Sequence, residues 1–139
     1  MTRSEFRDIR DLPDKTIVED IQFSAVGESS PVLIFENVRV QNSLGLDLRL
    51  NGKYNPLIGS LILNFRILDV GPICRLCING AMHSGSRTHK HSLQHEDDPR
   101  RNLPIVTARP DFERLAPGLV WAKLCAEAKI IHIGQFVNP

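Results

Sequence analysis

The chain has 139 residues, with 17 Lys or Arg and 16 Asp or Glu, so its formal net charge at pH 7 is +1. This balance excludes a protein that binds nucleic acid through bulk charge, but it is compatible with a local basic patch. Three cysteines make no disulfide framework, and no apolar stretch approaches the roughly 20 residues that a membrane helix needs. The N-terminal residues are charged, which is not typical of a signal peptide. We expect one cytoplasmic domain over residues 1–139, with no membrane partner.

The N-terminal segment, residues 1–16, carries apolar residues at a spacing of three. Phe6, Ile9 and Leu12 are these residues, and the spacing predicts a short amphipathic helix. A flexible N-terminal arm is the alternative, because chain ends are often poorly ordered.

From residue 17 the apolar residues alternate with polar ones, which predicts half-buried strands. The clearest set is Leu44, Leu46, Leu48 and Leu50, and Asn51-Gly52 directly after it is a strong hairpin signal. Because short turns separate the strands, the sheet should be antiparallel. The other strands are expected over 17–25, 32–40, 61–67 and 73–79, with shorter ones over 88–93 and 103–107.

The C-terminal part of the chain predicts one main helix. Pro117 is a good first helical residue, and an apolar stripe continues to Ala128, so we expect a helix over 117–128 after a short helical turn over 111–115. Residues 130–136 should form a closing strand or a packed tail. The predicted fold class is α+β, with a curved antiparallel sheet of five to seven strands packed on one C-terminal helix.

The stretch from 75 to 95 contains four of the five histidines: His83, His89, His91 and His95. If residues 88–93 are extended, His89 and His91 share one face of the strand, because side chains two apart point the same way. A hairpin would bring His83 back beside them, and Arg75 on the preceding strand would share that face. We therefore predict a cluster of three imidazoles and one guanidinium.

Two chemistries suit this cluster. The first is metal-independent RNA cleavage, with an acid–base pair drawn from His83, His89 and His91 and a phosphate clamp from Arg75, Arg87 or Lys90. The second is zinc binding, with His-x-His as a two-ligand edge and His83 or a cysteine completing a tetrahedral site. A solvated loop without any site is a third interpretation.

Other polar or thiol groups are expected to be structural. Cys74 and Cys77 match C-x-x-C, but an extended strand puts them on opposite faces, so core thiols are favoured over a cysteine zinc site. His132 is expected to be a packed residue. The acidic run 96–98 is expected to lie in a charged loop rather than to hold a cation. Trp121 and Cys125 are assigned to the helix core.

The pattern R-L-x-I-x-G-x-x-H, a polar insert and H-x-H, followed by a C-terminal helix, resembles an uncharacterised family of small proteins from bacteria, phages and plasmids. The likeness covers about the middle third of the chain. Here the insert is short (84–88), and Ser92-Leu93-Gln94-His95 replaces the usual aromatic run. The resemblance implies a role in toxin–antitoxin or phage–host conflict. The matching residues are Arg75, Leu76, Ile78, Gly80, His83, His89 and His91.

Together these features predict a small ribonuclease-like toxin or phosphodiesterase of such a conflict system, acting on RNA or paired with a cognate protein. In this prediction His83, His89, His91 and Arg75 do the chemistry without a cofactor, and zinc is the alternative. The competing prediction is a non-catalytic, phage-encoded inhibitor that binds a host defence complex, for example a CRISPR complex. From the sequence, enzyme and inhibitor both stay open.

Overall fold

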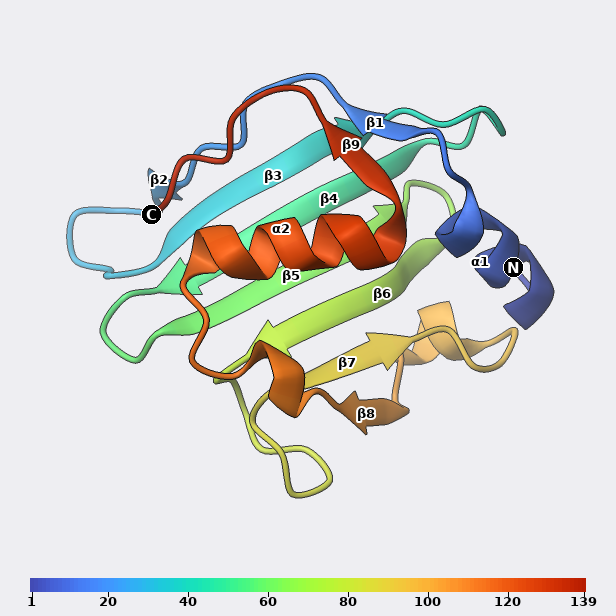
Figure 1. The fold of residues 1–139 in the computed structure, drawn as a ribbon. Helices are drawn as coiled ribbons and strands as arrows, with labels where there is room; N and C mark the ends of the chain where they lie inside the picture. The colour runs from blue at the N-terminus through green and yellow to red at the C-terminus, as the bar shows by residue number, and fades with distance from the viewer.

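A computed structural model describes the backbone of residues 1–139 and every side chain except those of Arg100 and Arg101. Its main element is a seven-stranded antiparallel sheet with the order β2-β3-β4-β5-β6-β7-β8, and helix α2 (Pro117–Ala128) lies across one face of it (Figure 1). The α+β fold class is thus confirmed. The strands are β2 (Ser24–Ala25), β3 (Leu33–Val40), β4 (Leu48–Asn55), β5 (Ser60–Ile67), β6 (Gly71–Ile78), β7 (His89–Ser92) and β8 (Val106–Ala108).

A second, two-stranded sheet joins the two ends of the chain. Its strands, β1 (Lys15–Ile17) and β9 (Ile130–His132), run parallel, which the long connection between them permits. The remaining elements are helix α1 (Arg3–Asp11) and the 3-10 turns η1 (Asp98–Arg101) and η2 (Pro110–Phe112). No helix in the described part of the chain is long and apolar enough to cross a membrane.

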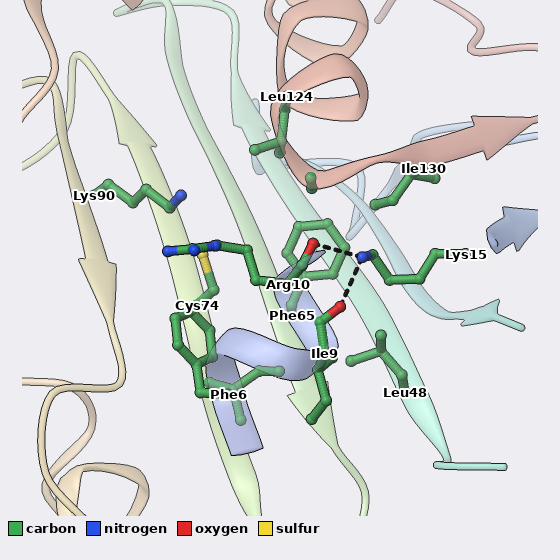
Figure 2. A pocket seen from close by; sticks show the side chains of 12 residues that line it. Phe6, Ile9, Arg10, Lys15, Leu48, Phe65, Cys74, Lys90, Leu124 and Ile130 are labelled. Carbon is green, nitrogen blue, oxygen red and sulfur yellow. Dashed lines mark hydrogen bonds between the residues drawn. The ribbon is translucent and has the colours of Figure 1, made fainter. Parts of the chain in front are cut away.

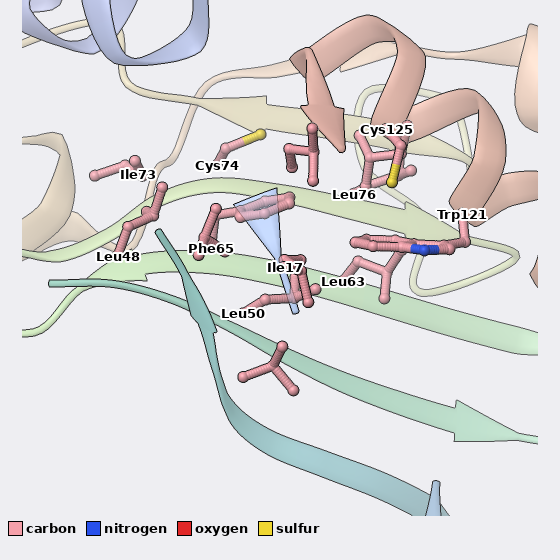
Figure 3. Packing of buried hydrophobic residues seen from close by; sticks show 14 of the residues in the cluster. Ile17, Leu48, Leu50, Leu63, Phe65, Ile73, Cys74, Leu76, Trp121 and Cys125 are labelled. Atoms are coloured by element: carbon pink, nitrogen blue, oxygen red, sulfur yellow. The ribbon is translucent and has the colours of Figure 1, made fainter. Parts of the chain in front are cut away.

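The hydrophobic core lies between α2 and the sheet, and we name the covered side the helix face and the opposite side the outer face. Trp121 and Cys125 of α2 lie over Leu63 and Leu76 (Figure 3), and all four are buried. Trp121 Nε1 donates to His132 Nδ1 at 3.0 Å. The expected packing roles of Trp121, Cys125 and His132 therefore agree with their positions.

Helix α1 forms as the spacing of Phe6 and Ile9 predicts, and both side chains are buried. A capping box starts it, because Thr2 and Glu5 each bond the other's backbone N–H. Under the helix lies a cavity of about 40 Å³ (Figure 2). At its rim, Lys15 Nζ donates to the carbonyls of Ile9, Arg10 and Leu12 at 2.7–2.8 Å.

The predicted hairpin at Asn51-Gly52 is wrong, because both residues lie inside β4 and the turn follows at 56–59. The reason is a long-range contact: a Cβ at Gly52 would lie 2.1 Å from Phe35 Cε1, so the glycine makes room for that ring. The third strand also begins later than predicted, at Leu48. Asn42 bonds both the N–H and the C=O of Leu46, and this turn replaces the start of the strand.

Two further boundaries differ from prediction. The expected strand over 17–25 is interrupted because Ile21 N donates to the Gln135 carbonyl in the C-terminal tail, at 2.8 Å. The expected strand over 103–107 starts only at Val106. Asn102 and Leu103 have φ of 58° and 55°, a left-handed conformation that no regular strand contains. The predicted helical turn over 111–115 is the shorter η2.

Candidate metal centre

Strands β6 and β7 position the predicted site. They are antiparallel neighbours in which Cys77 lies opposite His89 and Arg75 opposite His91. Because alternate residues share a face, these four side chains lie on the outer face, while Leu76 of β6 points into the core. The thiols of the C-x-x-C pair lie on opposite faces, as predicted.

His83 reaches the pair through a two-residue turn. His83 and Ser86 exchange backbone hydrogen bonds of 2.9 Å in both directions. Between them Ser84 and Gly85 have φ of 48° and 78°, the left-handed pair that a type I′ hairpin turn requires. The turn folds His83 back over β7.

The three imidazole rings consequently lie in contact. The ring centroids of His89 and His91 are 4.9 Å apart, and that of His83 lies 4.9 Å from the first and 5.5 Å from the second. His89 and His91 are buried, whereas His83 is exposed. The sequence therefore anticipated where the rings lie, and the chemistry assigned to them stays a prediction.

Each buried histidine has one nitrogen fixed by the backbone. His89 Nδ1 lies 3.1 Å from the Ser86 carbonyl, and His91 Nδ1 lies 2.7 Å from the Leu103 carbonyl. Since a carbonyl only accepts hydrogen bonds, each Nδ1 carries the proton and each Nε2 keeps a free lone pair. Both Nε2 atoms are buried without a hydrogen-bond partner. An unmet buried acceptor costs about 1–3 kcal/mol, so this pair of atoms requires an explanation.

Cys77 supplies a third donor at the same point. One ligand atom each from Cys77, His89 and His91 lies within 4.8 Å of the other two, and all three residues are buried. Around a tetrahedral zinc such atoms lie roughly 3.4–3.6 Å apart, so small side-chain rotations would bring them to bonding distance. The protonated Nδ1 atoms on backbone carbonyls are the outer-shell arrangement that orients zinc-binding histidines.

Burial sets the protonation of these groups. It lowers the pKa of His89, and it lowers the pKa of His91 to about 4, with the nearby Arg75 guanidinium acting in the same direction. Burial also raises the pKa of the Cys77 thiol, an effect that Arg75 partly offsets. Both imidazoles are therefore neutral at pH 7, the form that binds a metal.

Arg75 lies at the edge of this group. It is half-buried on the outer face, and its Nη1 donates to Asn102 Oδ1 at 2.8 Å. Asn102 belongs to the segment after η1, so this segment holds both Arg75 and, through Leu103, the His91 ring. The predicted guanidinium is thus placed beside the predicted imidazoles.

The other two proposed clamps are placed differently. Lys90 lies between the two histidines in sequence and therefore points to the helix face, where its Nζ is 2.6 Å from Glu127 Oε1. Arg87 is exposed and donates to the Gly80 carbonyl at 3.3 Å. Of the three candidates, Arg75 lies on the strand face of the paired histidines, Lys90 lies on the opposite face, and Arg87 lies outside the strands.

The acidic run and the fourth histidine have local roles. Asp98 is buried, and its Oδ2 accepts from the backbone N–H groups of Gln94 and His95. His95 itself is exposed on this loop. Asp98 therefore organises the loop before η1, and residues 98–101, which were expected to be loop, form this 3-10 turn instead.

Cys77 is the group that sequence reasoning undervalued. Considered as half of a C-x-x-C motif, it is paired with a thiol on the wrong face. The useful signal was the spacing: Cys77 lies two residues from Arg75, as His89 does from His91. Once the two strands are paired, all four side chains lie on one face.

No protein-family model, curated protein or solved structure matches this chain.

Proposed function

We propose that the chain is a zinc-dependent phosphodiesterase that acts on RNA, with Cys77, His89 and His91 as the zinc ligands. The observation that carries this proposal is the pair of buried Nε2 atoms that have no partner while both Nδ1 atoms are satisfied. A metal ion would bind both of these Nε2 lone pairs. A ligand set of one thiolate and two imidazoles favours zinc over magnesium or calcium.

The protonation states favour this chemistry over metal-free acid–base cleavage. A general acid has to be protonated near pH 7, and the pKa of His91 lies near 4. The same low value leaves the ring free to bind a cation. The metal-independent mechanism is therefore less favoured for this cluster than the zinc-dependent one.

Three protein ligands leave the fourth zinc position open, which is the pattern of catalytic rather than structural sites. Zinc bound there would lower the pKa of a coordinated water to near 7. His83 is exposed beside the three donors and can exchange a proton with solvent. Arg75 offers a fixed positive charge to the developing charge of a phosphoryl group.

The proposal is tested with metal-free protein reloaded with one equivalent of zinc. We expect hydrolysis of bis(p-nitrophenyl) phosphate and of a labelled RNA, with loss of both in His89→Ala and His91→Ala. His95→Ala is the matched control, because this exposed histidine lies on the loop outside the cluster, and it should keep wild-type rates. A zinc-loaded protein that hydrolyses neither substrate would contradict the proposed enzyme.

A further inference from the structure

A row of arginines crosses the outer face of the sheet. Arg39 of β3 lies directly opposite Arg49 of β4, and Arg49 lies directly opposite Arg66 of β5. Like charges placed directly opposite on neighbouring strands destabilise a sheet. We call these three residues the arginine row. An anion that bridges them would reduce the repulsion between their charges.

The row is only partly neutralised by the protein itself. Arg49 pairs with Asp47 at 2.5 Å and donates to the Asn37 carbonyl at 3.3 Å. Arg39 is exposed, and its backbone N–H rather than its guanidinium bonds Glu19. Arg66 Nε is buried without a hydrogen-bond partner. Two of the three guanidinium groups therefore have no hydrogen-bond or ion-pair partner among the described side chains.

The row leads toward the candidate metal centre. The adjacent row on the same face contains Asn64 of β5, Arg75 of β6 and His91 of β7 in continuous register. Asn64 Oδ1 is also buried without a partner. Neighbouring strands are about 4.8 Å apart, so β3 to β7 spans about 19 Å, the reach of a short nucleic-acid strand rather than of one nucleotide.

From this register we infer that the arginine row binds the phosphate backbone of a single-stranded nucleic acid and leads it to the zinc centre, an inference that rests on the proposed function. No Phe, Tyr or Trp shares the outer face in the described residues of β3–β7. Stacking on aromatic rings is therefore absent, and phosphate contacts should dominate binding. Such binding is insensitive to sequence and weakens steeply with salt.

The test is fluorescence anisotropy with a labelled 12-nucleotide oligouridylate over a series of salt concentrations, with metal-free protein so that the RNA is not cleaved during the measurement. The test variant is Arg39→Gln/Arg66→Gln, and the matched control is Arg7→Gln, an exposed arginine of α1 outside the row. The double variant should bind about tenfold more weakly at low salt, with a slope of log K against log salt shallower by about 1.4. Its unfolding temperature should equal or exceed that of the wild type, because like charges are removed.

A double variant that keeps the affinity and salt slope of Arg7→Gln would overturn the inference. Single-stranded DNA of matched length should bind like the RNA, and a clear preference for a duplex would overturn the single-strand assignment. The two proposals fail separately. Hydrolysis of bis(p-nitrophenyl) phosphate by the wild type tests the metal centre without the row, whereas oligonucleotide affinity tests the row without turnover.

Discussion

At the residue scale, the site depends on which nitrogen of each imidazole is free. The carbonyls of Ser86 and Leu103 hold the Nδ1 protons of His89 and His91, so both Nε2 atoms are free acceptors, and the two rings cluster with the buried Cys77. A neutral ring with a fixed tautomer is already in the state that a zinc ion binds. The tautomers of these two rings therefore need no change before zinc binds.

The thiol should be a ligand rather than a core residue. Cys77→Ala is expected to weaken zinc binding by more than about 100-fold, since even the loss of an outer-shell partner costs 10–100-fold. Cys125→Ala is the matched control, because Cys125 is buried on α2 over the helix face. Competition with a chromogenic chelator measures both affinities. Equal zinc affinity in the two variants would remove Cys77 from the ligand set.

The buried histidines should also make the metal-free protein sensitive to acid. Their pKa values lie below the ordinary value near 6.5, so the unfolded chain binds protons before the folded one as pH falls. Stability is thus fully present above about pH 6.5 and is lost progressively down to about pH 4. Urea unfolding at pH 7.5 and 4.5 measures this loss.

His91→Gln should show a smaller loss of stability between these two pH values, since it removes the imidazole whose pKa is lowered to about 4 by burial. His95→Ala, on an exposed loop, should retain the wild-type pH dependence. An unchanged pH dependence in His91→Gln would show that this ring does not take up its proton on unfolding.

At the element scale, helix α1 is held by one buried amine. Lys15 Nζ donates to three carbonyls at the end of the helix, and the side chain is only 2% exposed. Lys15→Met should lower the free energy of unfolding by about 1–3 kcal/mol, because the carbonyls lose their donor. Lys129→Met, at an exposed position, should change it by less than about 0.5 kcal/mol. Chemical denaturation decides, and equal stability of the two variants would deny this role to Lys15.

A variant of the turn that carries His83 can test the proposed proton exchange by this residue separately from metal binding. A β-branched residue is strained at φ 78°, so Gly85→Val should displace His83 and lower turnover at least tenfold while zinc stays bound. Gly27→Val is the control, because Gly27 has open space around it and no positive φ. Full turnover by Gly85→Val would place proton exchange elsewhere.

The elements also show what the sequence could and could not predict. Alternation located β5, β6 and β7, and Pro117 located the start of α2, because these signals are local. The hairpin predicted at Asn51-Gly52 is wrong because the Phe35 ring, which is distant in sequence, packs where a side chain at Gly52 would lie and so needs this glycine inside a strand. The shared face of His89 and His91 was readable from their spacing. The contact of His91 with Leu103 was not, since it depends on how the chain returns after η1.

At the scale of the whole molecule, the two faces of the sheet have different compositions. The helix face is mostly apolar and is covered by α2, and this packing accounts for the fold. The outer face carries the arginine row, Arg75 and the three metal donors, and nothing in the packing of the core requires them there. This division is compatible with the polyanionic substrate that we propose for the site.

The proposed activity depends most on zinc bound by one thiolate and two imidazoles, and X-ray absorption spectroscopy of the zinc-loaded protein tests this directly. The expected spectrum has one sulfur at about 2.3 Å and nitrogen neighbours at about 2.0–2.1 Å, with one zinc per chain. A first shell of oxygen alone, or a protein that retains no zinc, would contradict the proposed zinc centre.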